Sequence, residues 1–288
     1  MRIKELFSKK TVFSFEIFPP KKTSSIDVIY KTLEEMRDLS PDFISVTFSA
    51  GGSGNGMLSC EIASKLKDEY GITPMIHLPC INYTKSEITT VLDELQSRGI
   101  ENILALRGDI MPESEPKNDF SHASDLITFI KAHGNYDIGG ACYPEGHAEA
   151  ETMIQDILNL RKKVDAGADH LITQLFFDNN AFYEFREKAA IAGIDVPIEA
   201  GIMPVMNKKQ IERMVSMCGA SLPSKFTKMM QKYENNPEAL RDAGIAYAVN
   251  QIVDLISNGV DGIHLYTMNN AYVARKISEA ISGLIGAK

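Results

Sequence analysis

The feature of this 288-residue sequence that most limits its fold is a regular alternation of short apolar segments with amphipathic ones. The apolar segments are rich in branched and aromatic residues and lack polar alternation, which is typical of strands buried on both faces of a parallel sheet. Between them, apolar residues recur at helical spacing. The expected strands are 11–18, 43–48, 74–78, 102–109, 138–144, 170–177, 197–204 and 262–267. The expected helices are 26–39, 58–70, 86–98, 122–133, 148–166, 239–258 and 270–284, with a helical insertion at 222–236.

Eight strand-then-helix units predict a closed (β/α)8 TIM barrel formed by residues 1–288 as a single domain. A doubly wound parallel sheet is the alternative. No strand–turn–helix unit carries the G-x-G-x-x-G or P-loop pattern that such sheets use for nucleotides. In the helix at 148–166, the residues expected to face the sheet are Ile154, Ile157, Leu158, Leu160 and Val164.

Charge and composition exclude several classes of protein. The net charge of −8 argues against a nucleic-acid partner, which would need a basic face. No apolar run approaches the length of a membrane span, and residues 1–7 resemble a short amphipathic helix rather than a signal peptide. We therefore expect a cytoplasmic protein with no membrane partner. The four cysteines form no Cys-x-x-Cys pair, so no metal site is expected from them.

A carboxylate, Glu16, lies inside the first strand, between Phe15 and Ile17. Burial in an apolar site favours the protonated form of a carboxyl group, which can then donate a proton at neutral pH. The alternative is a structural ion pair with Lys21 or Lys22. Pro19 and Pro20 cannot donate to a sheet, so the strand ends directly after this glutamate.

Other polar residues occur near the ends of the predicted strands, and a barrel brings strand ends together at one mouth. They are Thr47, His77, Arg107, Asp109, Tyr143, Gln174 and Tyr266. Acidic, cationic and phenolic groups with aromatic neighbours suit a flat heterocycle with polar edges. Neither a metal triad, a nucleophile elbow nor a central strand lysine is visible. The remaining possibility is acid–base chemistry by Glu16 or Asp109 beside a bound organic cofactor.

Eight collinear motifs extend this pattern over nearly the whole chain. They are FEIFPP at 15–20, SVT at 45–47, HL at 77–78, LRGD at 106–109, YPEGH at 143–147, ITQLFFD at 172–178, GIMP at 201–204 and HLYTMN at 264–269. In this order and spacing they resemble the bacterial, FAD-dependent 5,10-methylenetetrahydrofolate reductases.

The resemblance implies a flavin barrel that takes hydride from NADH or NADPH and reduces 5,10-methylenetetrahydrofolate to 5-methyltetrahydrofolate, which supplies methyl groups for methionine synthesis. It implies that Glu16 is the acid that opens the folate ring, and that Asp109 stabilises developing positive charge. The implied flavin contacts are Thr47, His77, Arg107, Gly108, Asp109, His122, Ala123, Tyr143, His147, Asp156, Asn159, Lys162 and Lys163. The implied folate contacts are Glu16, Asp109, Gln174, Gln210, Met214 and Tyr266.

Three positions depart from the pattern of that family: His122, where Tyr is frequent, Met214, where an aromatic residue or Leu is common, and Asn270, where Arg is often found. Rival functions are a folate-dependent methyltransferase acting on a corrinoid protein, an FMN-dependent barrel oxidoreductase, and a barrel that only binds a partner. The resemblance also implies a homo-oligomer, and a protein electron donor in place of the nicotinamide stays open.

Overall fold

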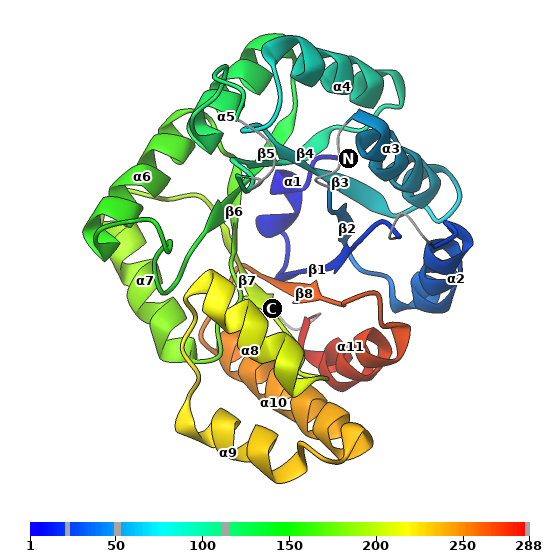
Figure 1. Ribbon diagram of the computed structural model, residues 1–288, viewed down its shortest axis with the longest axis vertical. Coiled ribbons are helices and arrows are strands. Elements are labelled where there is room, and N and C mark those ends of the chain that lie inside the picture. The colour runs from blue at the N-terminus through cyan, green and yellow to red at the C-terminus, as the bar shows by residue number, and fades with distance from the viewer. Residues whose placement is uncertain (21–23, 49–52, 111–115, 286–288) are drawn as a thin grey trace.

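Eight parallel strands form a closed barrel in which each strand pairs with its neighbours in sequence and β1 pairs with β8 (Figure 1). A computed structural model describes residues 1–20, 24–48, 53–110 and 116–285. Lys21 and Lys22, the expected partners of Glu16, lie outside these ranges. The strands are β1 (Val12–Ile17), β2 (Phe43–Val46), β3 (Thr73–Pro79), β4 (Asn102–Leu106), β5 (Asp137–Cys142), β6 (His170–Thr173), β7 (Ile198–Ile202) and β8 (Gly262–Tyr266). The predicted TIM barrel is confirmed.

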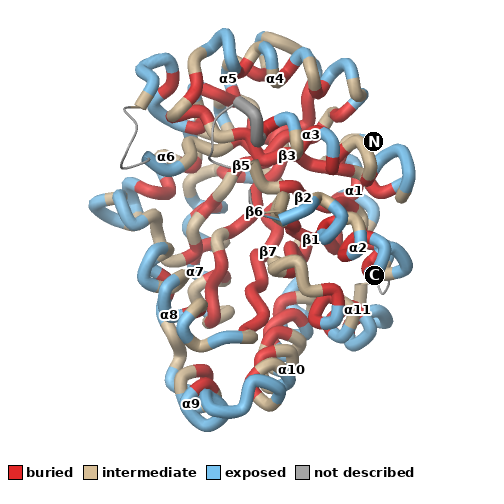
Figure 2. The backbone as a smooth tube through the Cα atoms, turned by 45° about the vertical axis from the view of Figure 1, so that its right-hand side comes forward, coloured by how far each residue is buried: buried red, intermediate tan, exposed pale blue. Residues whose placement is uncertain are grey.

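Helices surround the barrel and cover the outer face of its strands, so the strands are buried almost throughout (Figure 2). They are α2 (Asp27–Met36), the 3-10 helix η1 (Arg37–Leu39), α3 (Ser53–Asp68), α4 (Lys85–Ser97), α5 (Ala123–His133), α6 (Met153–Asp165), α7 (Asn179–Ile191), α8 (Lys208–Cys218), α9 (Ser224–Tyr233), α10 (Pro237–Ser257) and α11 (Ala271–Ile285). None of the helices described is both long and apolar enough to cross a membrane.

Local sequence signals set several of these helix ends. Thr84 accepts a hydrogen bond from the backbone N–H of Glu87, whose carboxylate accepts from the backbone N–H of Thr84, which is a capping box at the start of α4. Asn236 caps α10 in a similar way, and Pro237 occupies its first turn, where proline removes no helical hydrogen bond. Such caps set the residue at which each helix begins.

Three features of the helices differ from the sequence-based expectations. Helix α3 begins at Ser53 rather than near residue 58, and α6 begins at Met153 rather than near 148, because Thr152 caps it. Helices α7 and α8 were not anticipated. Ile154 and Leu158 do not face the sheet: they are 74% and 51% exposed, whereas Ile157 and Leu160 on the same helix are buried.

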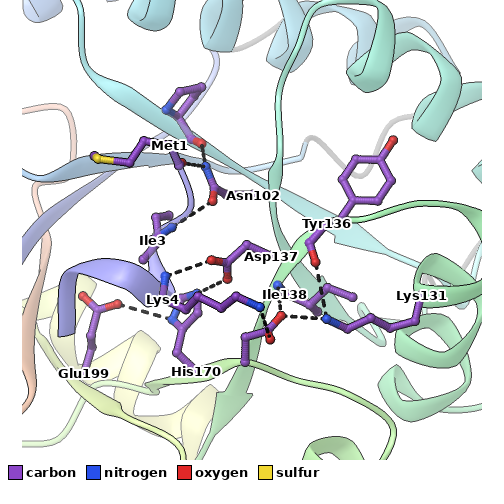
Figure 3. Close-up of polar contacts among 12 residues, drawn as sticks. Met1, Ile3, Lys4, Asn102, Lys131, Tyr136, Asp137, Ile138, His170 and Glu199 are labelled. Carbon is purple, nitrogen blue, oxygen red and sulfur yellow. Dashed lines mark hydrogen bonds and ion pairs between the residues drawn. The ribbon is translucent and has the colours of Figure 1, made fainter. Parts of the chain in front are cut away.

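The bottom of the barrel, where the strands begin, is closed by the N-terminal helix α1 (Lys4–Phe7). Ile3, Leu6 and Phe7 pack against the first residues of several strands. The backbone N–H of Ile3 donates to Asn102 Oδ1 at 3.1 Å, and that of Lys4 donates to Asp137 Oδ2 at 2.8 Å (Figure 3). With the floor closed in this way, the opposite end, where the strands finish, is the open mouth.

Candidate active site

Glu16 lies at the mouth end of β1 and is only 8% exposed. Its backbone carbonyl accepts a hydrogen bond from Thr267 Oγ1 at 2.6 Å, which holds β1 against the segment that follows β8. Its carboxylate faces two imidazoles, with Oε2 at 3.5 Å from His77 Nε2 and 3.8 Å from His264 Nε2. The predicted carboxylate is therefore a buried group that projects into the barrel.

His77 is a neutral neighbour of Glu16 rather than a cationic one. Burial lowers the pKa of His77 to about 4, although the nearby Glu16 carboxylate opposes this shift. Desolvation outweighs the charge attraction because the whole ring is removed from water. Within the described part of the chain, His77 Nε2 has no hydrogen-bond partner, so it is available to a group entering the mouth.

Tyr266 connects Glu16 to the next part of the mouth. Its hydroxyl donates to the backbone carbonyl of Thr173 at 2.7 Å, and desolvation raises its pKa well above the usual value, with the Glu16 charge as the next cause. The charge of Tyr143 also affects Tyr266, so the two phenols share one region of the mouth. Gly201 makes this arrangement possible, because a Cβ there would lie 2.3 Å from the Thr173 carbonyl oxygen.

A cavity of about 400 Å³ lies beside this region, at the ends of β4 and β5. Its walls hold Arg107, Lys162 and Lys163 together with the first turn of α5. Cationic side chains and a helix N-terminus are the groups that bind phosphate in proteins. All the predicted flavin contacts except Thr47, His77, Gly108 and Asp109 line this cavity.

The cations in this cavity are held in place by hydrogen bonds. Arg107 makes a bidentate pair with Glu149, in which Nη2 lies 2.8 Å from Oε1. Lys163 Nζ donates to the Ala141 carbonyl at 2.8 Å, and burial lowers its pKa. Lys162 Nζ donates to Asn159 Oδ1 at 3.1 Å. The donor set fits the diphosphate of a dinucleotide, and an incoming phosphate would compete with Glu149 for Arg107.

The other four predicted flavin contacts, Thr47, His77, Gly108 and Asp109, follow or end neighbouring strands outside the cavity lining. Thr47 follows β2, and its N–H donates to the Ile17 carbonyl at 3.0 Å, directly beside Glu16. Gly108 has a φ of +83°, which favours glycine, and a Cβ there would lie 2.8 Å from Pro79 Cβ. Both the backbone conformation and the close contact therefore disfavour a side chain at this position. Asp109 is exposed, and its charge affects both Tyr143 and Cys218, which places it between the cavity and α8.

The remaining predicted folate contacts are dispersed around the mouth. The side chain of Gln174 accepts from the backbone N–H of Leu175 at 2.9 Å, just after β6. Gln210 and Met214 lie one turn apart on α8. Met214 packs against the same apolar cluster as Tyr266. In the described part of the chain, no hydrogen bond or ion pair joins these α8 residues to Glu16.

Polar residues inside the strands were missed by the sequence reasoning, which considered mainly strand ends. Ser14, His264 and Glu199 are fully buried and lie below Glu16. Their signal in the sequence is spacing, since Ser14 and His264 each precede an inward-facing mouth residue by two positions, the period of a strand. Among the described residues, no three His, Cys, Asp or Glu side chains are arranged to hold a metal ion.

Comparison with known proteins agrees with this geometry. The family model described as methylenetetrahydrofolate reductase matches residues 2–282. The 5,10-methylenetetrahydrofolate reductase of Escherichia coli (strain K12) is 36% identical over 275 residues, which cover 96% of this chain and 90% of that protein. The Arabidopsis thaliana methylenetetrahydrofolate reductase (NADH) 1 is 36% identical over 276 residues, 90% of this chain and 46% of that protein.

A solved structure shares the fold at lower sequence similarity. It is an uncharacterized protein from Clostridium thermocellum that binds two copies of 5-methyl-5,6,7,8-tetrahydrofolic acid. Its TM-score is 0.67 at 16% identity, and the match covers 98% of this chain and 99% of that one. With the family model spanning almost all of the sequence, the chain belongs to the methylenetetrahydrofolate reductase family.

Proposed function

We propose that this protein reduces 5,10-methylenetetrahydrofolate to 5-methyltetrahydrofolate with a nicotinamide as hydride source. Family membership supports the reaction. The observation that carries the proposal is the position of Glu16, a nearly buried carboxyl group held between two imidazoles beside a cavity lined by cations. An acid next to a dinucleotide site is the combination that reduction of a protonated heterocycle requires.

FAD is the cofactor that we assign to the cavity. Arg107, Lys162, Lys163 and the N-terminus of α5 would hold its diphosphate, since these groups offer fixed charges and N–H donors. When bound, FAD supplies the chemistry of accepting hydride from the nicotinamide and delivering it to the folate. Tyr143 lines the cavity, and its charge affects Tyr266, which is next to Glu16, so the residues that would hold FAD lie close to the proposed acid.

Glu16 is assigned the role of proton donor. In its protonated form it would give a proton to a ring nitrogen of the folate, so that the five-membered ring opens to an iminium cation that can accept hydride. The exposed carboxylate of Asp109 would stabilise the positive charge that develops. Gln174, Tyr266, Gln210 and Met214 would bind and orient the folate from the surrounding walls.

We also propose that the chain acts as a single domain in the cytoplasm and associates into a homo-oligomer. The pairing of β1 with β8 supports one domain, because the barrel closes only with both ends of the chain. Ile154 and Leu158 support association. They lie one helical turn apart on α6 and are 74% and 51% exposed, which is unusual for adjacent large apolar side chains.

The experiment that tests the proposed function is an anaerobic titration followed by visible absorption. The purified protein is expected to be yellow, to bleach with NADH or NADPH, and to recover its colour when 5,10-methylenetetrahydrofolate is added. Comparing the two nicotinamides identifies the preferred donor. A colourless protein that binds no FAD, yet transfers a methyl group from folate, would instead support the methyltransferase alternative.

A further inference from the structure

Below Glu16, the interior of the barrel contains a line of buried polar side chains that the proposed reaction does not use. From the mouth downward they are His264, Ser14, Glu199, His170 and Asp137, and each is 0% exposed. Ser14 Oγ lies 2.7 Å from His264 Nδ1 and 2.8 Å from Glu199 Oε2. His170 lies between two carboxylates, with Nδ1 3.6 Å from Glu199 Oε1 and Nε2 3.6 Å from Asp137 Oδ1 (Figure 3).

The two carboxyl groups in this line, Glu199 and Asp137, each contact specific neighbours. His170 faces one carboxylate through each ring nitrogen, Glu199 on one side and Asp137 on the other. Burial raises the pKa of Asp137. Asp137 also accepts the backbone N–H of Lys4 in the floor helix, so the lower end of the line is attached to the N-terminal segment.

The short contacts around Ser14 determine how the protons are arranged. A serine hydroxyl has one hydrogen, and an ionised carboxylate can only accept, so Ser14 donates to Glu199. The Ser14 oxygen then accepts from His264 Nδ1–H across 2.7 Å. In a neutral His264 ring the other nitrogen, Nε2, carries no hydrogen, and this is the nitrogen that faces Glu16 Oε2 at 3.8 Å.

The groups that face the Glu16 carboxylate from the neighbouring strands include no lysine or arginine among the described residues. His77 on β3 is neutral, because burial lowers its pKa to about 4. Ser45 on β2 lies 3.4 Å from the same Nε2 of His264, and Tyr266 on β8 already donates its hydroxyl hydrogen to the Thr173 carbonyl. Among the described residues, the cationic or imidazole groups within 4.0 Å of the Glu16 carboxylate are the rings of His77 and His264.

The ring of His264 packs between two aromatic neighbours. It stacks against Phe43 at 6.0 Å between ring centroids and meets Tyr266 edge-on at 5.4 Å. Its shortest polar contact is with Ser14, through Nδ1.

We propose that Glu199 and Ser14 are positioning residues that fix His264 as the Nδ1–H tautomer, so that its Nε2 acts as the acceptor that keeps a proton on Glu16. This inference rests on the proposed acid role of Glu16. Glu199 and Ser14 would not contact the substrate, but they would determine whether the Glu16 carboxyl group carries a proton.

The decisive variant is Glu199→Gln, which keeps the size of the side chain and reverses its hydrogen bonding. When the Gln amide N–H₂ points to Ser14 it donates to the Ser14 oxygen, and the Ser14 hydrogen then turns to its nearest remaining acceptor, His264 Nδ1. The ring then carries its hydrogen on Nε2 and becomes a donor to Glu16, which favours the ionised carboxylate. We expect folate reduction at neutral pH to fall by about tenfold or more, since an acid above its pKa loses about tenfold of its protonated form for every decrease of one in that pKa.

Several readouts separate this positioning role from a structural one. Lowering the pH should restore most of the lost rate of folate reduction in E199Q, because the Glu16 carboxylate becomes protonated again. The nicotinamide-to-flavin half-reaction should stay within about twofold of the parent, since that step uses no proton from Glu16. Ser14→Ala breaks the same link and should shift the pH dependence in the same direction. Ser278→Ala, which removes a buried serine hydroxyl from α11, is the matched control and should leave the profile unchanged.

Nitrogen NMR of histidine-labelled protein tests the tautomer without any reaction. The His264 signals, assigned by comparison with His264→Gln, should show hydrogen on Nδ1 in the parent protein and on Nε2 in E199Q. A parent ring with hydrogen on Nε2 would overturn the proposal, as would an unchanged pH profile in both E199Q and S14A. If E199Q does not fold, the S14A profile and the parent tautomer decide.

Glu16→Gln distinguishes failure of this inference from failure of the proposed acid. If E16Q no longer reduces folate while E199Q and S14A behave like the parent, the acid role stands and the positioning role is wrong. If E16Q reduces folate at the parent rate with FAD bound, the acid assignment itself is wrong.

Discussion

At the scale of single residues, the mouth contains two carboxyl groups in contrasting environments. Glu16 is 8% exposed and faces imidazoles, whereas Asp109 is exposed at the rim. Environment assigns different roles to chemically similar groups, because a buried carboxyl retains its proton more readily than a solvated one. The two environments therefore match the two different roles proposed for Glu16 and Asp109.

Replacing the acid should affect one half-reaction. In Glu16→Gln the amide cannot donate a proton of comparable acidity, so we expect folate reduction to slow by about a hundredfold to ten-thousandfold. Reduction of the flavin by nicotinamide should change little. Rapid-mixing absorbance at the flavin band measures both steps, and Gln251→Asn, at a buried amide on α10, serves as a control.

Asp109→Asn removes a charge without changing shape. We expect it to slow folate reduction much more than nicotinamide oxidation, because the positive charge develops only on the folate. The same rapid-mixing measurement compares the two steps. Equal slowing of both would contradict this role and indicate a general effect on flavin binding.

The buried ring of His77 should make stability depend on pH. Its pKa is lowered from 6.5 to about 4 by burial, so between these values the unfolded chain binds a proton that the folded protein does not. Stability from this group is therefore complete above pH 6.5 and is lost as the pH falls toward 4. A change of this size corresponds to a loss of roughly 3 kcal/mol.

Denaturant unfolding of the parent and of His77→Asn, at neutral pH and near pH 4, measures this contribution. The variant has no ring to titrate, so it should lose less stability on acidification than the parent does. An identical loss in both proteins would show that other groups cause the acid sensitivity.

At the scale of elements, close approaches between strands build the mouth. Gly201 on β7 leaves room for the Tyr266 hydroxyl to reach the Thr173 carbonyl, and Gly201 N–H donates to Thr173 Oγ1 at 2.8 Å. A side chain here would separate β6, β7 and β8 at the level where folate is proposed to bind. The composition of a strand thus controls the shape of the site as well as the packing of the sheet.

Gly201→Ala should therefore destabilise the protein by about 1–3 kcal/mol, the usual cost of forcing an extra group into a packed interior. The control is Gly283→Ala on α11, where a Cβ would meet nothing within 4 Å. Alanine in that helix should instead be neutral or stabilising by roughly 0.5–1 kcal/mol. Urea unfolding compares the two, and equal effects would contradict the steric argument.

At the scale of the whole molecule, helix α6 exposes two large apolar side chains that lie one helical turn apart. Ile154 and Leu158 extend outward from α6, whose other residues Asp156, Asn159, Lys162 and Lys163 line the cavity. One helix therefore serves the proposed flavin site and the proposed contact between subunits. Association of two copies would remove these side chains from water and hold α6 in place.

The double variant Ile154→Asp and Leu158→Asp should lower the mass measured by sedimentation, because burying two charges opposes association. Ile191→Asp is the control, since Ile191 is 87% exposed at the end of α7 and is expected to lie outside the contact. A parent protein that is already monomeric, or a double variant of unchanged mass, would contradict the assignment.

The sequence by itself determined the order of eight strands, the barrel and the residues at strand ends such as Glu16 and Arg107, because periodicity and parallel strand direction are local or follow from connectivity. Only the tertiary structure decided which polar groups inside the strands meet. Ser14 is 250 residues from His264 and 185 residues from Glu199 along the chain, and strand register alone brings them within hydrogen-bond distance. It also decided that Ile154 and Leu158 face outward, because the start of α6 at Met153 sets which side of the helix meets the barrel.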